Sequence, residues 1–154
     1  MFPALAQRLV ACLYSYESKP AEPTKHLQMT LKNPERHILV MQPDELEKFA
    51  REWAILKKGY FGVERFSGPG DMGRDVVGYL TKAKHEGDWH NYQCKQYGKA
   101  VPLASGLSEL GKILHFAHEG SFTAPTKYFF VAPKGVVRPL REFISKPSQL
   151  KRIA

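Results

Sequence analysis

The stretch from Arg74 to Thr81 constrains the fold most, because its apolar side chains point to both sides of a strand. Successive side chains of a strand alternate between its two faces. Val77 and Tyr79 therefore share one face, while Val76 and Leu80 share the other. A strand that is apolar on both faces has to be covered on both, so we predict that this strand lies inside the protein rather than half exposed to solvent.

Helical and strand patterns alternate along most of the chain. Apolar residues at helical spacing predict helices over 43–57, 102–118 and 136–144. Shorter apolar runs predict strands over 60–66, 75–81, 90–97 and 126–131. Loops rich in glycine, proline and charged residues are predicted at 67–74 and 82–88. We therefore expect an α/β fold with a central mixed sheet of about four strands flanked by helices.

The N-terminal part of the chain has weaker patterns. Apolar residues near helical spacing predict an extra helix within residues 4–15. Residues 18–36 contain three prolines and predict a connector, with a short extended piece at 26–31, and residues 37–41 predict a strand.

The chain of 154 residues has room for one domain with its own core. We assign residues 1–42 to an N-terminal helix and connector and residues 43–154 to the main domain. The basic, proline-containing end has no obvious stop, which favours a longer natural protein that continues beyond it.

The composition indicates an anionic partner and a reducing compartment. Lysine and arginine number 23 against 15 aspartate and glutamate, a formal charge of +8 that favours nucleic acid, although composition alone also fits a basic protein without such a partner. The only cysteines, Cys12 and Cys94, give little support for a disulfide framework. No apolar run approaches the roughly 20 residues that span a bilayer. We expect a cytoplasmic protein with no membrane partner.

Three polar residues are predicted to converge on one face of the sheet. Gln93 and Lys95 share a side of their strand, and an antiparallel neighbour would bring Asp75 opposite them. Isolated charges on edge strands are commonly solubility devices, which is the simpler reading. The glycine-rich loop before Asp75, the two-sided apolar strand after it and the order of elements favour a functional site.

The motif residues resemble a known nuclease family. Gly70-Asp71-Met72-Gly73-Arg74-Asp75, then Gln93-Cys94-Lys95, with Glu47 on the preceding helix, resemble the Mrr-like branch of the PD-(D/E)xK restriction-endonuclease-like superfamily over about residues 43–132. The chain is also similar to nuclease domains at the N-terminus of larger bacterial anti-phage effectors. The resemblance implies a restriction-endonuclease-like core in αβββαβ order and a metal-dependent DNA endonuclease for restriction or anti-phage defence.

The resemblance also implies roles for single residues. Asp75 would be the central metal ligand, with Gln93 in place of the usual acidic residue and the backbone carbonyl of Cys94 completing the inner shell. Lys95 would hold or polarise the attacking water, because a lysine with a pKa near about 10.4 is a poor base at neutral pH. Glu47 is the candidate helix carboxylate, with Glu45 and Glu52 as alternatives on the same helix. The expected cofactor is Mg²⁺ or Mn²⁺, bound weakly by the free protein because Gln93 is neutral.

Several basic residues are candidates for contacts with double-stranded DNA. Those nearest the motifs are Arg74, Lys82, Lys84 and Lys99. Asp71 is expected to support its glycine-rich loop by Asx-type hydrogen bonds rather than to bind metal. A catalytically inactive DNA-binding module of the same fold, or a basic scaffold or oligomerisation domain, remains an alternative. A homo-oligomer or a larger defence complex that supplies activation is also open.

Overall fold

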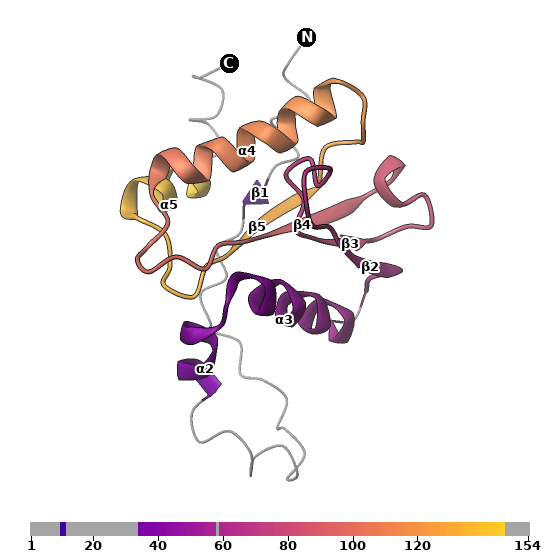
Figure 1. The fold of residues 1–154 in the computed structure, drawn as a ribbon. Coiled ribbons are helices and arrows are strands. Elements are labelled where there is room, and N and C mark those ends of the chain that lie inside the picture. The colour runs from indigo at the N-terminus through magenta and orange to yellow at the C-terminus, as the bar shows by residue number, and fades with distance from the viewer. Residues whose placement is uncertain (1–9, 12–33, 58, 147–154) are drawn as a thin grey trace, which may run out of the picture.

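The computed structural model describes residues 10–11, 34–57 and 59–146 (Figure 1). The strands are β1 (Val10–Ala11), β2 (Gly62–Arg65), β3 (Val76–Tyr79), β4 (Trp89–Cys94) and β5 (Lys127–Val131). The α-helices are α2 (Pro34–Val40), α3 (Pro43–Leu56), α4 (Leu103–His118) and α5 (Arg138–Ser145), with a short 3₁₀ turn at Lys84–Glu86. Among these elements, no helix is long and apolar enough to cross a membrane.

One mixed sheet organises these elements in the strand order β1-β5-β4-β3-β2. Strand β3 is antiparallel to both β2 and β4, whereas β5 is parallel to β4 and to β1. The parallel step from β4 to β5 requires a crossover, and α4 provides it. The predicted α/β class with a mixed sheet of about four strands is confirmed, and the two-residue β1 adds a fifth strand at one edge.

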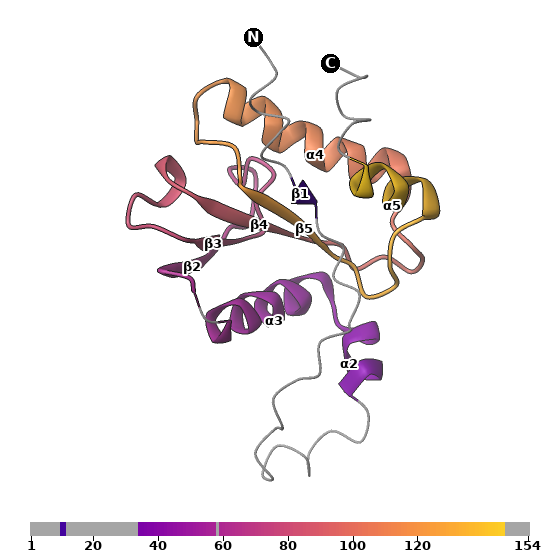
Figure 2. The ribbon, with the colours of Figure 1, turned by 180° about the vertical axis from the view of Figure 1, so that it is seen from behind.

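Helices cover both faces of the sheet. Figures 1 and 2 show α3 on one face and α4 with α5 on the other, in views from opposite sides. Val76 packs into the core beneath α3, and Val77 packs into the core beneath α4 and α5. All four residues of β3 are buried. The expectation that this strand is covered on both faces is therefore confirmed.

Helix α3 follows its sequence pattern closely. Pro43 occupies the first turn, where its missing N–H costs nothing, and Glu45 Oε2 accepts a hydrogen bond from the Gln42 backbone N–H at 2.7 Å. Leu46, Ala50 and Ala54, spaced four residues apart, are its buried residues. The predicted helices at 102–118 and 136–144 and all four predicted strands from 60 onward are confirmed, with ends that differ by a few residues.

The predicted strand at 37–41 is wrong, because Pro34–Val40 form helix α2. A short apolar run does not by itself distinguish a helix from a strand. Gln96 stabilises the end of this helix, since its Nε2 donates to the backbone carbonyls of Ile38 and Met41 at 3.1 and 2.7 Å. Carbonyls at the end of a helix lack partners within the helix, and Gln96 supplies one from a distant part of the chain.

The helix predicted within residues 4–15 is wrong at Val10–Ala11, which form strand β1 and pair with Lys127 and Tyr128 of β5. Pairing with the open edge of β5 satisfies the backbone N–H and C=O groups of this segment. The helical spacing of its side chains does not reveal this pairing with a distant strand. The remainder of that helix and the extended piece at 26–31 lie outside the described residues.

We predict that Gly78→Ala destabilises the fold by about 1–3 kcal/mol, because a Cβ at position 78 would lie 2.6 Å from the ring of Tyr60. That ring is held in place, since the Tyr60 hydroxyl bonds to His90 Nδ1 at 2.6 Å and to the Tyr92 hydroxyl. Urea denaturation measures the effect. Gly98→Ala, with nothing within 4 Å of the added Cβ, is the matched control, and equal stability of the two variants would contradict the prediction.

Candidate functional site

Asp75 and Gln93 meet across two strands. The antiparallel register pairs Val76 with Tyr92, so Asp75, just before β3, lies opposite Gln93 near the end of β4. Gln93 Nε2 donates a hydrogen bond to Asp75 Oδ2 at 2.7 Å. The two residues are only 8% and 2% exposed. The structure thus places this carboxylate and this carboxamide in direct contact, on the sheet face that α4 covers.

The Asp75 carboxylate is anchored through one of its two oxygens. Oδ2 accepts a second hydrogen bond from the backbone N–H of Cys94 at 2.7 Å, and among the described residues no hydrogen bond reaches Oδ1. Burial raises the pKa of Asp75 to about 6. The Cys94 hydrogen bond and the charge of Lys95 act in the opposite direction, whereas Glu47 and Glu109 add to the rise.

Lys95 lies on the same side and forms an ion pair with Glu109 of α4. Lys95 Nζ is 2.8 Å from Glu109 Oε1, and the two side chains are 16% and 13% exposed. Burial alone would lower the pKa of Lys95, but the hydrogen bond and charge of Glu109, together with the charge of Asp75, raise it. The amine therefore stays protonated at neutral pH, which suits an electrostatic role and not that of a base.

Sequence reasoning missed Glu109. The pattern of α4 drew attention to its apolar residues, and Glu109 stands beside the buried Leu110. The available signal was the crossover itself, because a helix that connects β4 to β5 must pass over one face of the sheet. Glu109 Oε2 also lies 3.3 Å from Lys112 Nζ, one helical turn further on, so Glu109 forms ion pairs with two lysines.

Of the acidic residues of α3 considered for the site, Glu47 is the one whose burial and charge interactions connect it to Asp75 and Lys95. It is partly buried, whereas Glu45 and Glu52 are exposed. Burial raises the pKa of Glu47, with Arg65 and Lys95 opposing the rise and Asp44 and Asp71 adding to it. Glu47 Oε2 is 3.5 Å from Arg65 Nη1. These interactions place Glu47 within electrostatic range of both Lys95 and Asp75.

The loop before Asp75 is held by Asp71. The Gly73 N–H donates to Asp71 Oδ1 at 2.9 Å, which confirms the predicted Asx-type hydrogen bond. Met72 and Gly73 have φ values of 55° and 84°, the left-handed conformation that glycine adopts without strain. A Cβ on Gly73 would lie 3.3 Å from the backbone nitrogen of Ile113, so α4 packs closely against this loop.

Arg74, predicted to contact DNA, lies inside the protein. It is 9% exposed, and its guanidinium packs 4.2 Å from the ring centre of Phe66 and 5.0 Å from that of Phe122. Its Nε donates to the carbonyl of Asp71 at 2.7 Å. The side chain therefore supports the loop that leads to Asp75. In this structure it is not available as a surface contact for phosphate.

The other predicted DNA-contact residues, Lys82, Lys84 and Lys99, are exposed. Lys84 Nζ is 2.6 Å from Glu64 Oε1, and Lys82 Nζ lies 5.8 Å from the ring centre of Phe61. The surface ion pair of Lys84 breaks easily and Lys82 is exposed, so both amines are accessible to a polyanion.

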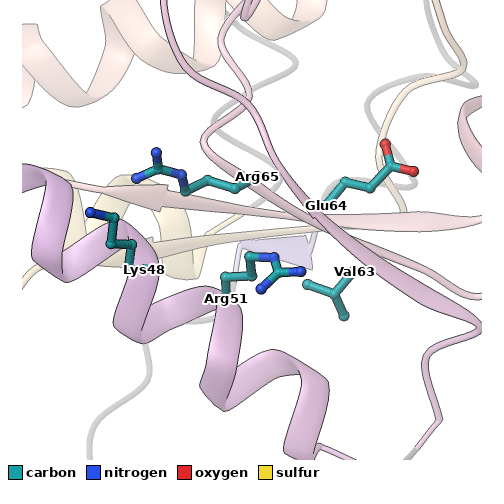
Figure 3. Close-up of a pocket in the computed structure, with 5 residues that line it drawn as sticks. All are labelled: Lys48, Arg51, Val63, Glu64 and Arg65. Atoms are coloured by element: carbon teal, nitrogen blue, oxygen red, sulfur yellow. The ribbon is translucent and has the colours of Figure 1, made fainter.

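An open surface pocket of about 440 Å³ lies between α3 and β2 (Figure 3). Its lining is Lys48, Arg51, Val63, Glu64 and Arg65. Asp44 pairs with both Lys48 and Arg65 at 2.5 Å, which neutralises part of the positive charge. The pocket lining contains none of the motif residues, although Arg65 links it to Glu47.

The side chains that could hold a metal ion here are few. Among the described residues, no cluster of three or more histidine, cysteine, aspartate or glutamate side chains could hold a metal ion. Asp75 Oδ1 is the carboxylate oxygen left without a hydrogen bond from the described residues. Mg²⁺ is bound in proteins by one or two carboxylates together with water and substrate phosphates. A cation beside Oδ1 would also stabilise the ionised carboxylate that burial disfavours.

Comparisons of the chain with protein-family models, curated proteins and solved structures find no match. The function is therefore inferred from the residues of this chain and from the geometry of Asp75, Gln93 and Lys95.

We predict that Asp75→Asn increases the free energy of unfolding at pH 7.5 by about 1–3 kcal/mol. The native pKa of about 6 exceeds the ordinary value of 3.8, so the native state binds more protons than the unfolded state between these values. Stability should therefore fall as the pH rises from about 4 to about 6 and level off above. Asparagine has no charge to desolvate, so the variant should lose this dependence. Urea denaturation from pH 4 to pH 8 tests it, and parallel curves for the two proteins would contradict it.

Proposed function

We propose that this chain is a metal-dependent DNA endonuclease with a restriction-endonuclease-like core. The order α3, β2, β3, β4, α4, β5 supports the proposal, as does the position of the motifs at the start of β3 and the end of β4. The observation that carries it is the contact between Asp75 and Gln93 at 2.7 Å, with the partly buried ammonium of Lys95 in the same electrostatic cluster.

The roles follow from the charge that a phosphodiester develops during hydrolysis. A bound Mg²⁺ or Mn²⁺ would neutralise that charge and activate a water. Asp75 would hold the cation through Oδ1, with the backbone carbonyl of Cys94 and phosphate oxygens as further ligands. Lys95 remains protonated, so its charge counters the negative charge of the transition state. Glu109 holds the Lys95 amine, and Glu47 adds negative charge near the cation.

The partner in this proposal is double-stranded DNA. The net charge of +8 and the exposed Lys82, Lys84 and Lys99 favour a polyanion. Cutting both strands requires two sites, which makes a homo-oligomer or a larger complex part of the hypothesis. The proposed role is restriction or anti-phage defence in the cytoplasm, with target choice and activation supplied elsewhere.

An inactive DNA-binding module of the same fold is the second candidate. The specific observation behind it is that Gln93 is neutral and that its amide nitrogen, not its oxygen, faces Asp75. Only one carboxylate then remains in direct position to bind a cation. DNA affinity that falls steeply with salt, without any cleavage, would support this candidate.

We predict that the wild-type protein cuts plasmid DNA in the presence of Mg²⁺ or Mn²⁺, and that Asp75→Ala and Lys95→Ala each lower the rate by about 100-fold or more. The reason is that each removes a charge that acts in the transition state. Agarose gel electrophoresis measures cleavage, and substitution of the exposed Lys146 of the C-terminal part, Lys146→Ala, is the control for loss of one positive charge. Cleavage that survives both substitutions would refute the proposed site. Undetectable DNA binding at low salt would favour a basic scaffold instead.

We predict that Glu109→Gln lowers turnover by about 10-fold, because the Lys95 ammonium loses the carboxylate that fixes its position. The partly buried ammonium of Lys95 is then less well paired, so the free energy of unfolding should fall by about 1–3 kcal/mol. Glu142→Gln on α5 is the matched control, since it removes an exposed ion pair with Arg138 at 2.7 Å. Equal turnover in the two variants would rule out a role for Glu109 in positioning Lys95.

A further inference from the structure

A row of hydrogen-bonded polar side chains crosses the sheet face beneath α4. The Tyr128 hydroxyl of β5 donates to Gln93 Oε1 at 3.1 Å, and Gln93 Nε2 donates to Asp75 Oδ2 at 2.7 Å. Tyr128 is fully buried, in the same core as Val77 and Ile113. Buried polar groups are costly unless they are paired. The row is paired from Tyr128 to Asp75, and Gln93 in its middle has a hydrogen-bond partner on each side.

The two neighbours of Gln93 determine which way its amide points. Asp75 Oδ2 already accepts a hydrogen bond from the Cys94 backbone N–H, and the Tyr128 hydroxyl donates to the other end of the Gln93 amide. A reversed amide would set Gln93 Oε1 against Asp75 Oδ2 at hydrogen-bond distance, two acceptors facing each other. The amide nitrogen therefore faces Asp75, and the amide oxygen is held by Tyr128, away from the carboxylate.

We propose that Gln93 is a positioning residue that acts through Asp75, and that Tyr128 is the buried anchor that holds Gln93 in this orientation. This inference rests on the proposed function and replaces the direct metal-ligand role that the resemblance implies for Gln93. The two donors on Oδ2 fix the rotation of the carboxylate, so that Oδ1 is the oxygen presented to the cation and phosphate.

Neighbouring Asn91 extends the polar row. Asn91 is fully buried on β4, pairs in register with Tyr128, and donates from Nδ2 to the carbonyl of Gly73 at 3.4 Å. Asn91 thus connects β4 to the loop before β3, while its Oδ1 is buried without a hydrogen-bond partner among the described residues. Asn91 and Gln93, at alternate positions of β4, and Tyr128 of β5 are thus three buried polar side chains on one sheet face, an arrangement that would be costly if their only role were packing.

The first test separates positioning from ligation. Gln93→Met keeps the length of the side chain and removes both the donor and the acceptor. A positioning role predicts that turnover falls about 10- to 100-fold while the affinity for Mn²⁺, measured by water-proton relaxation, changes less than about 3-fold. Asp75→Asn is the reference for loss of the true ligand. Loss of Mn²⁺ affinity by about 10-fold or more in Gln93→Met would overturn the proposal.

The second test concerns Tyr128. Tyr128→Phe should lower kcat by about 3- to 10-fold with unchanged KM for DNA, and it should have no further effect in the Gln93→Met background, because the two residues act as one unit. Tyr79→Phe is the matched control, since its hydroxyl bonds to Glu64 at 3.0 Å outside the row. A Tyr128→Phe effect of the same size in both backgrounds would mean a general structural role and would overturn the anchor.

A spectroscopic readout keeps this inference separate from the proposed function. The side-chain NH₂ resonances of Gln93 in ¹H–¹⁵N spectra should shift in Asp75→Asn and in Tyr128→Phe, and should stay in place in Tyr79→Phe. If the wild-type protein fails to cut DNA, the proposed function fails, while these shifts still report the orientation of the amide. Resonances that ignore both substitutions would refute the arrangement itself.

Discussion

The pair of hydrogen bonds that Asp75 Oδ2 accepts from Gln93 and from the Cys94 backbone is the constraint on which the site depends. It exists only because β3 and β4 pair in one register. A slip of one residue would turn Asp75 to the opposite face, against the apolar core beneath α3, and would remove Gln93 from it. Burial of the Asp75 carboxyl has two further effects: it raises the pKa to about 6, and it strengthens the interactions with nearby charges.

Packing on both faces and a rigid loop hold that register. Val76 and Val77 anchor β3 in two separate cores, and the close approach of Tyr60 to Gly78 leaves no room for another side chain there. The loop before the strand is closed by the Asx hydrogen bond of Asp71, and the guanidinium of Arg74 donates to two of its carbonyls. The position of Asp75 is thus fixed by the loop that precedes it and by the strand that follows it.

The sequence predicted the features that depend on short stretches of the chain. The alternation of a strand placed Asp75 and Gln93 opposite each other, and helical spacing predicted α3 and α4. The sequence did not predict Glu109, because the phase of α4 over the sheet depends on packing between distant segments. The burial of Arg74 between Phe66 and Phe122 has the same origin. The roles of Asp75 and Lys95, their metal and their substrate stay predictions.

The neutral Gln93 attracts a cation less than a glutamate would, but it places no second negative charge beside Asp75. A glutamate there would attract a cation more strongly, by about 4 kcal/mol for a charge at about 4 Å with an effective dielectric of about 20. It would also place a second carboxylate within 2.7 Å of Asp75 Oδ2, and like charges that close share a proton when no cation is present. Glutamine avoids this, because its amide donates to the ionised carboxylate and favours the charged form. In a cluster where the charges of Glu47 and Glu109 already raise the pKa of Asp75, a neutral amide adds no further negative charge, at the expense of affinity for the cation.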